Sequence, residues 1–462
     1  MYSVPRLSLF VSDFFSVLLL AIGIASISSN LLAREQPNIV VILADDIGIE
    51  TVSAYGSEYP TPHIDSLADN GIRFDQGHAT PVCTTTRTRL LAGTYNFKHY
   101  QAFAHLNPSL YTLPKYIREA GYSSVVVGKW QMAGNMEYGG RGSYPEDLGF
   151  DEHLVWQLER SLKGSRYWQP TLTENGAAKT YCHDDFAPKL FNDYVLDFID
   201  RNHKEKFFIY YNPVLAHDPW TTTPNSLEAD TPKEKFAGMM AYLDKMVGRL
   251  LDKLEEHEIV ENTLIWFIGD NGTHPQITSL RHGKSVTGGK WETRTNGTHV
   301  PFILQWKARL PRGIIKSDLV EVLDVYPTVA AGVGRPVPFA LDGINLLPYS
   351  LSQSSQTREA IFMHYDPQWG SDYFQSHMPA DRFIFDAHWK YYADGRFFNT
   401  QADPQEERDL AKSNLNGEAQ LAYESLKQAF LNMKDGPLKE PYMNKPFKGL
   451  KIPEPDASCR DL

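Results

Sequence analysis

The stretch NIVVILADDIG at residues 38–48 decides the fold. After Asn38, every residue as far as Ala44 is apolar, and most are β-branched. Such a run is typical of a strand buried on both faces, as in a parallel sheet with helices on each side. It leads directly into Asp45 and Asp46, and open α/β sheets bind ligands at the carboxyl ends of their strands. We therefore expect an α/β fold with a polar site beside the end of this strand.

Two more oxygen-bearing side chains follow a second predicted strand. The largely apolar run from residue 263 to 268 is followed closely by Asp270 and Asn271. Adjacent carboxylates repel one another, and a bound cation relieves that repulsion. Ligands that offer only oxygen favour calcium or magnesium. Taken alone, Asp45 and Asp46 also fit a solvated acidic turn, so the second strand end is what favours a metal site.

Three basic side chains also follow predicted strands. Lys129 comes after the strand 123–127, His217 after the strand 207–211, and Lys290 in the long loop beyond Asp270. An ammonium group at such a position can meet an oxyanion, and imidazole suits proton transfer. A surface lysine and a structural histidine are the alternatives. Because the strand ends of a parallel sheet lie at one edge, the coincidence of these residues indicates a metal-dependent active site.

The segment PVCTTTRTRLLAG at residues 81–93 places Cys83 ahead of an apolar helical run. The start of a helix favours negative charge, so this position suits an anionic substrate. Arg87 would lie one turn further along on the same face. A small buried cysteine before an ordinary helix is the alternative. We interpret Cys83 as the precursor of a catalytic nucleophile.

The remaining patterns define the domains. Helices are predicted from Pro62 and over 112–121, 186–202 and 233–254. The last of these has one apolar stripe, which is typical of core packing. Beyond about residue 342 the pattern changes to short aromatic strands, a helix over 417–433 and a proline-rich, extended tail from 441. We expect a catalytic domain over 37–345 and a C-terminal subdomain over 346–462.

Charge and the N-terminus bear on partners and location. The net charge of -11 argues against nucleic-acid binding, which needs a broad basic surface. Residues 1–33 have Arg6, an apolar run over 14–27 and a small, polar end, which is typical of a secretory signal peptide. We expect a periplasmic or extracellular protein with no membrane span in the mature chain. In an oxidising compartment Cys182 and Cys459 could pair, which would leave Cys83 as the special thiol.

Taken together, the motifs resemble the formylglycine-dependent sulfatases of the alkaline phosphatase superfamily. The likeness runs from Asn38 to about Leu410 through LADDIG, TPHIDSLADNGIRF, CTTTRTRLLAG, GKWQ, AHDPW, GDNG, GGKWETRTNGTHVP and FFNTQADPQEERDL. The resemblance implies an alkaline phosphatase-like fold. In this α/β fold a large mixed, mostly parallel sheet is sandwiched by helices, and a smaller C-terminal antiparallel sheet with a helix follows.

The resemblance also implies roles for the site residues. A maturation enzyme would oxidise Cys83 to formylglycine, whose hydrated aldehyde attacks sulfur. Arg87 would hold the diol, Lys129 and Lys290 would grip the sulfate oxygens, and His217 would protonate the leaving alcohol. One calcium ion would be bound by Asp45, Asp46, residue 83, Asp270 and Asn271.

Two positions depart from the family pattern. Thr85 stands where the family usually has proline or alanine, which bears on recognition by the maturation enzyme. Gln131 stands where the family usually has a histidine that helps to expel sulfate. An amide hydrogen-bonds but cannot take a proton. Two alternatives follow: water or another base removes the proton, or Gln131 serves in substrate recognition instead.

The resulting hypothesis is an exported sulfatase that acts on a sulfated carbohydrate. His364, Tyr365 and Arg382 are candidate sugar contacts, with local packing and surface charge as the alternative. A phosphodiesterase or phosphonate hydrolase of the same superfamily would use nearly the same site. A glycan-binding protein that has lost catalysis would instead keep an intact Cys83 thiol.

Overall fold

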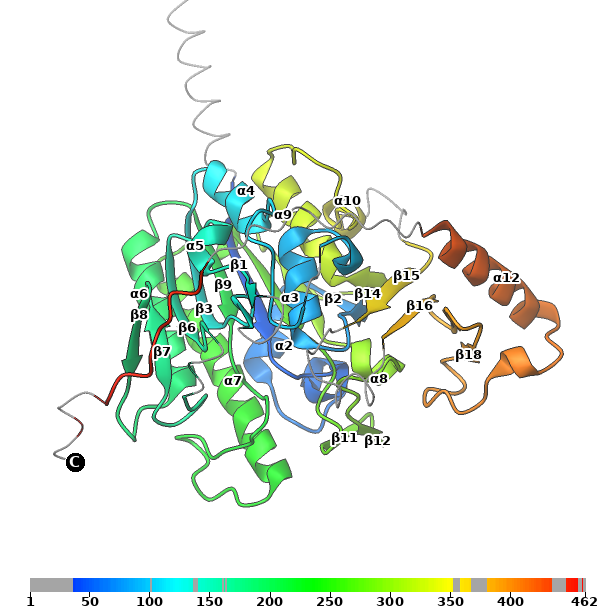
Figure 1. The fold of residues 1–462 in the computed structure, drawn as a ribbon, viewed down its shortest axis with the longest axis horizontal. Coiled ribbons are helices and arrows are strands. Elements are labelled where there is room, and N and C mark those ends of the chain that lie inside the picture. Colours follow the sequence, from blue (N-terminus) through cyan, green and yellow to red (C-terminus); the bar gives the residue numbers. More distant parts are fainter. Residues whose placement is uncertain are drawn as a thin grey trace, which may run out of the picture.

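The protein is described here from a computed structural model, which covers residues 36–99, 102–135, 140–159, 162, 164–351, 358–366, 380–433, 446–455 and 459. The predicted signal peptide lies outside these residues. A mixed sheet of ten strands forms the centre, in the order β14-β2-β13-β10-β1-β9-β3-β6-β7-β8 (Figure 1). The strands are β1 (Asn38–Ala44), β2 (Ile72–His78), β3 (Ser123–Lys129), β6 (Glu152–Trp156), β7 (Thr171–Glu174), β8 (Ala177–Thr180), β9 (Phe207–Asn212), β10 (Thr263–Gly269), β13 (Phe302–Gln305) and β14 (Ile314–Glu321).

Strand β1 lies at the middle of the parallel part of the sheet. It pairs in parallel with β10 on one side and with β9 on the other, and β3 and β6 continue the parallel order. Its side chains alternate between two apolar cores, with Val40 and Ile42 in one and Ile39 and Val41 in the other. All four are fully buried, which explains why the strand is apolar without interruption.

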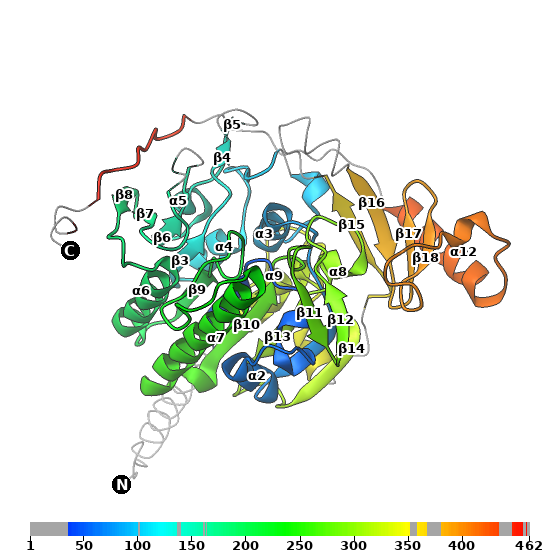
Figure 2. The ribbon, with the colours of Figure 1, turned by 90° about the horizontal axis from the view of Figure 1, so that it is seen from below.

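Helices cover both faces of the sheet (Figure 2). The core that contains Val40 is closed by α2 (Pro62–Asp69), α6 (Ala187–Asn202) and α7 (Pro232–Glu256). The opposite core is closed by α3 (Cys83–Ala92), α4 (Leu113–Glu119) and α9 (Val325–Val333). The short helices are α5 (Pro145–Leu148), α8 (Thr295–Thr298) and α10 (Leu347–Ser350). The predicted helices are confirmed to within a few residues at each end.

The two edges of the sheet are antiparallel in part. Strand β13 runs against both β10 and β2, and β7 and β8 form a hairpin beyond β6. Strand β2 has the sequence IRFDQGH, whose polar residues hide it from a search for apolar runs. Two further hairpins lie outside the main sheet, β4 (Gly134–Asn135) with β5 (Gly140–Arg141) and β11 (Thr278–Arg281) with β12 (Lys284–Thr287).

A four-stranded antiparallel sheet follows, as predicted. It consists of β15 (Ile361–Tyr365), β16 (Asp381–Phe385), β17 (Trp389–Tyr392) and β18 (Phe397–Asn399). On one face Met363 and Tyr365 pack with Val82, next to α3. On the other face Phe362 packs beneath α12 (Gly417–Asn432). The small sheet therefore has an inner face toward the catalytic domain and an outer face toward its own helix.

The chain then returns to the far edge of the main sheet (Figure 1). The amides of Lys448 and Leu450 donate to the two carboxylate oxygens of Glu159 over 2.9 and 3.1 Å. Cys182 and Cys459 form a disulfide with their Cα atoms 5.2 Å apart, which confirms the predicted pairing. Within the described residues, no helix is long and apolar enough to cross a membrane.

Candidate active site

The ends of four neighbouring parallel strands carry the predicted polar residues to one edge of the sheet. Asp45 and Asp46 follow β1 directly, and Asp270 and Asn271 follow β10. Lys129 is the last residue of β3. These side chains are all buried. Because β10, β1, β9 and β3 are adjacent, the polar residues converge as the sequence predicts.

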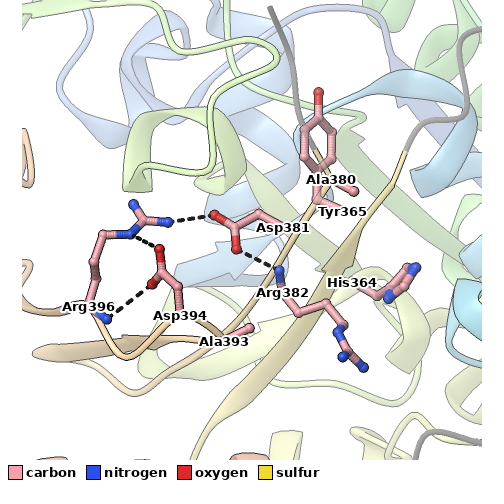
Figure 3. A pocket seen from close by; sticks show the side chains of 8 residues that line it. All are labelled: His364, Tyr365, Ala380, Asp381, Arg382, Ala393, Asp394 and Arg396. Carbon is pink, nitrogen blue, oxygen red and sulfur yellow. Dashed lines mark hydrogen bonds and ion pairs between the residues drawn. The ribbon is translucent and has the colours of Figure 1, made fainter. Parts of the chain in front are cut away.

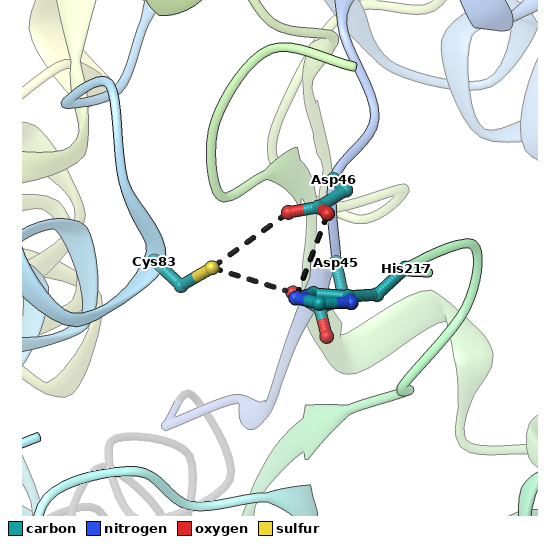
Figure 4. Close-up of side chains that lie close together, drawn as sticks. All are labelled: Asp45, Asp46, Cys83 and His217. Carbon is teal, nitrogen blue, oxygen red and sulfur yellow. Dashed lines mark hydrogen bonds and ion pairs between the residues drawn. The ribbon is translucent and has the colours of Figure 1, made fainter. Parts of the chain in front are cut away.

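Cys83 is the first residue of α3 and faces the two aspartates (Figure 4). Its Sγ lies 3.6 Å from Asp45 Oδ1 and 3.7 Å from Asp46 Oδ1. Burial, together with the charge of Asp270, raises the pKa of the Cys83 thiol well above its usual range. The unmodified thiol is therefore held protonated and makes a poor nucleophile.

Each carboxylate of the site is paired with a buried cation. Lys129 Nζ lies 2.6 Å from Asp45 Oδ1, and Lys290 Nζ lies 2.5 Å from Asp46 Oδ2. Arg87 Nη2 lies 2.8 Å from Asp270 Oδ2 and completes the set. The charges of the three carboxylates and the three cations therefore cancel.

Two opposing effects set the carboxyl pKa values. Burial would raise the pKa of Asp45, but Lys129 and Arg87 outweigh it and lower the value. For Asp270, burial and the neighbouring charge of Asp45 raise the pKa to about 6. A further cation beside these carboxylates would offset both the burial of Asp270 and its repulsion by Asp45.

Two oxygens in this cluster fit a metal ion. Asp45 Oδ2 and Asn271 Oδ1 are buried, and neither has a hydrogen-bond partner among the described residues. Such atoms are costly to bury unless they bind a ligand. Ligand atoms of Asp45, Asp46, Cys83 and His217 also lie within 4.8 Å of one another. Oxygen donors from carboxylate and amide groups suit a hard cation such as calcium.

His217 lies at the same edge, in the loop after β9. Its Nδ1 donates to Asp218 O over 2.5 Å, so the neutral ring presents the lone pair of Nε2 to the site. Lys290 Nζ lies 3.0 Å from this Nε2, which is 3.6 Å from Asp46 Oδ2. Burial, together with the positive charges of Arg166 and Lys290, lowers the pKa of His217 well below its usual value.

Comparisons with known proteins agree with this geometry. The family model described as Sulfatase matches residues 37–334, which is more than half of the chain. The chain belongs to the sulfatase family, whose members are sulfuric ester hydrolases. It is 27% identical over 359 residues to the arylsulfatase of Hemicentrotus pulcherrimus, covering 71% of this chain and 64% of that protein. It is 26% identical over 382 residues to the N-acetylgalactosamine-6-sulfatase of Canis lupus familiaris, covering 72% and 70%.

Solved structures share the sulfatase fold. Ps i-CgsB, solved in complex with k-i-k-neocarrahexaose, has a TM-score of 0.70 at 23% identity and covers 87% of this chain and 94% of its own. A structure in complex with its substrate D-glucosamine-2-N,6-O-disulfate has a TM-score of 0.69 at 19% identity, covering 86% and 97%. The phosphonate monoester hydrolase of Agrobacterium radiobacter has a TM-score of 0.65 at 18% identity, covering 86% and 95%. The fold alone therefore does not separate sulfate from phosphonate chemistry.

Three residues at the centre of this sulfatase have left-handed backbone angles, which also occur elsewhere in the described chain. Asp46, Gln131 and Trp291 adopt left-handed φ angles of 59°, 57° and 72°. Such angles are uncommon outside glycine and often mark functional sites. Gln131 follows Lys129 closely, and its Oε1 is buried without a partner among the described residues. The amide thus lies beside the sulfatase centre, and its role there stays a prediction.

His364 and Arg382 lie on the small C-terminal sheet, on its outer face toward α12. They lie opposite each other on β15 and β16 and line a hollow of about 510 Å³ with Asp381, Asp394 and Arg396 (Figure 3). The alternation along β15 puts His364 on the same face as Phe362, which packs beneath α12. Tyr365, on the inner face, is the residue that approaches the sulfatase centre. Substrate contact by His364 and Arg382 stays a prediction.

Sequence reasoning missed Arg166 beside the centre, and it named Tyr365 only as a candidate sugar contact. The Tyr365 hydroxyl is buried without a partner among the described residues, and burial and the nearby Cys83 raise its pKa. The charge of Arg166 helps to lower the pKa of both Asp45 and His217. Arg166 does not follow an apolar strand in the way that Asp45 does, so the pattern that predicted the other site residues gives no signal for it.

Proposed function

We propose that this sulfatase is exported and removes sulfate from a sugar, using a formylglycine made from Cys83 and one calcium ion. The placement of Cys83 is the observation that carries the proposal. Residue 83 begins a buried helix and faces two aspartates at 3.6 and 3.7 Å, but the thiol itself is held protonated. A site built around an inactive thiol makes sense when that thiol is the precursor of another group.

The calcium ion would be held by Asp45, Asp46, Asp270 and Asn271 together with residue 83. The unpartnered oxygens of Asp45 and Asn271 support this assignment. When bound, such an ion polarises the sulfate and favours the ionised form of the nucleophile. It would also offset the effects of burial and of the charge of Asp45, which together raise the pKa of Asp270 to about 6.

The chain's own side chains would bind the substrate and move one proton. Lys129 and Lys290 would hold the sulfate oxygens, and Arg87 would orient the nucleophile. His217 would protonate the leaving oxygen as the sulfur–oxygen bond breaks. The bound anion offsets the positive charge of Lys129 and Lys290, which favours the protonated imidazole. The alcohol would leave with that proton, and overall one sulfate ester and one water molecule would give the free alcohol and inorganic sulfate.

A sugar substrate and export have separate support. A relative named N-acetylgalactosamine-6-sulfatase and a structural neighbour solved with a glucosamine disulfate support a sulfated saccharide. The disulfide between Cys182 and Cys459 supports an oxidising, periplasmic or extracellular location. A formylglycine-generating maturation enzyme would be a necessary partner, and it must accept Thr85.

The intact mass of the peptide that contains Cys83, taken from protein made in its natural host, tests the proposal. Formylglycine is expected to lower the mass by about 18 Da. The purified enzyme should then release sulfate from an aryl sulfate faster than it cleaves the matched aryl phosphodiester. An unmodified thiol without sulfate release would favour the glycan-binding alternative. Faster phosphodiester turnover would favour the phosphonate hydrolase alternative, with which the fold is also compatible.

A further inference from the structure

Three consecutive side chains hold the loop that carries His217. Arg166 Nη1 donates to Asp218 O over 3.0 Å, and Trp168 Nε1 donates to Thr222 O over 3.0 Å. Between them, the Tyr167 hydroxyl donates to Val214 O over 2.9 Å and also contacts the carbonyl of His217 itself. We call Arg166, Tyr167 and Trp168 the carbonyl clamp.

Outside the clamp, backbone hydrogen bonds hold this loop near His217: the Asp45 amide donates to Leu215 O over 3.0 Å, and the His217 amide donates to Val214 O over 3.3 Å. Strand β9 ends at Asn212, and residues 213–231 form neither helix nor strand. The peptide groups next to His217 are nevertheless buried, since Val214, Leu215 and Ala216 are at most 1% exposed. Buried carbonyl groups need donors, and here side chains from another loop supply them.

The clamp is itself fixed from behind. The guanidinium of Arg166 lies 4.4 Å from the centre of the Trp156 ring, at the end of β6. The Ala187 amide donates to Tyr167 O over 2.8 Å, at the start of α6. The ring centres of Trp168 and Phe186 lie 4.7 Å apart. Two elements of the main fold therefore determine where the clamp donors point.

We infer that the carbonyl clamp positions His217 for proton transfer to the leaving group, with Tyr167 as its central residue. This inference rests on the proposed role of His217. Tyr167 is a positioning residue, because its hydroxyl contacts the backbone on both sides of Ala216 and reaches no reacting atom. A displacement of His217 by a fraction of an ångström lengthens the path of the proton to the leaving oxygen.

The test uses Tyr167→Phe in the matured enzyme, which keeps the ring and removes the donor. A series of sulfate esters is compared, from p-nitrophenyl sulfate to esters of phenol and simple alcohols, which are poorer leaving groups. Proton donation matters most for poor leaving groups. Tyr167→Phe is expected to lower kcat by about 10- to 100-fold on the poorest leaving groups and by less than about 3-fold on p-nitrophenyl sulfate. His217→Ala should show the same selective loss, but larger.

Tyr122→Phe is the matched control. Its hydroxyl is buried without a partner among the described residues. Tyr122 precedes the first residue of β3, whereas the site lies at the other end of that strand. This variant should leave the dependence on the leaving group unchanged. If Tyr167→Phe does not fold, as judged by thermal melting, Trp168→Phe removes the neighbouring donor and is judged by the same outcomes.

The outcomes distinguish a failure of the clamp inference from a failure of the acid role of His217. If His217→Ala loses activity selectively but the clamp variant loses it equally on all esters, or not at all, the clamp inference is wrong and the acid role of His217 stands. If His217→Ala itself loses activity equally on all esters, the acid role fails, and the inference that rests on it is overturned as well.

Discussion

Helix α3 touches two buried clusters of ion pairs, and they differ in one respect. Arg87 belongs to the active site, whereas Arg89, two residues on, binds Glu321 over 2.6 Å. In the second cluster Arg358 lies 2.8 Å from Glu321 and 2.5 Å from Asp324. Every carboxylate oxygen of this second cluster has a partner.

The active-site cluster is incomplete by comparison. Asp45 Oδ2 and Asn271 Oδ1 have no hydrogen-bond partner among the described residues. The two clusters share burial and charge, and Asp270 and Asp324 both have a pKa raised to about 6. The second cluster is saturated in its carboxylate oxygens and holds the fold together, whereas the active-site cluster is unsaturated in its acceptor oxygens and is prepared for a ligand. Variants in each cluster should therefore affect different properties.

The largest expected effect is on activity at the unsaturated cluster. Cys83→Ala removes the precursor of the nucleophile and should lower kcat for an aryl sulfate by at least about 10³-fold. It also removes a group that crowds two aspartates, so the melting temperature should change little. Sulfate release and thermal unfolding measure the two effects. Residual activity above a tenth of the wild type would exclude Cys83 as the source of the nucleophile.

A matched pair of arginine variants should distinguish the roles of the two clusters. Arg89→Met leaves Glu321 with one buried, unpaired oxygen and should cost about 3–5 kcal/mol of unfolding free energy. The kcat of the molecules that remain folded should stay within a few-fold of the wild type. Arg87→Met should instead lower kcat by about 10²-fold or more. Denaturant unfolding and initial rates distinguish them, and equal effects of both variants on kcat would remove the distinction.

Calcium should act on one cluster alone. At a concentration about 1,000 times its Kd, calcium that binds only the folded protein adds about 4 kcal/mol of stability. Chelation should therefore lower the melting temperature and the activity, and added calcium should restore both. Asp45→Asn should weaken the response to calcium, whereas Glu321→Gln should keep it. A response that survives in Asp45→Asn would place the ion elsewhere.

The smallest expected effect is the loss of stability in acid that arises at His99, which lies outside both clusters. Burial lowers the pKa of His99 to about 4, well below the value of an unfolded histidine. The unfolded chain therefore binds more protons between about pH 6.5 and 4, so stability falls as the pH drops through this range. His99 contributes at most about 3 kcal/mol. His99→Gln should flatten the plot of melting temperature against pH below 6.5, and an unchanged slope would contradict the assignment.

The sequence predicted the strands whose two faces are both buried. Strands β1 and β10 are continuous apolar runs, and the residues that follow them are the ones that converge. Strand β2 escaped prediction because it mixes polar and apolar residues at the antiparallel edge of the sheet. Local pattern thus reports burial, and it reports site residues only where they follow a buried strand.

Two other parts of the site required the tertiary structure. The alternation along β15 predicts two faces but does not say which one meets α3, so the sequence cannot separate Tyr365 on the inner face from His364 on the outer face. The carbonyl clamp lies in a loop without periodic pattern, and its partners come some 50 residues later in the chain. Contacts between two irregular segments leave no signal in either segment alone.

The disulfide between Cys182 and Cys459 has a consequence for how the molecule is made. Its second cysteine emerges 277 residues after the first. Until then the carboxylate of Glu159 also lacks the amides of Lys448 and Leu450. The catalytic edge can therefore assemble during synthesis while the opposite border of the molecule stays open. The disulfide that closes this border must wait for Cys459, and a chain that stops short of Cys459 never forms it.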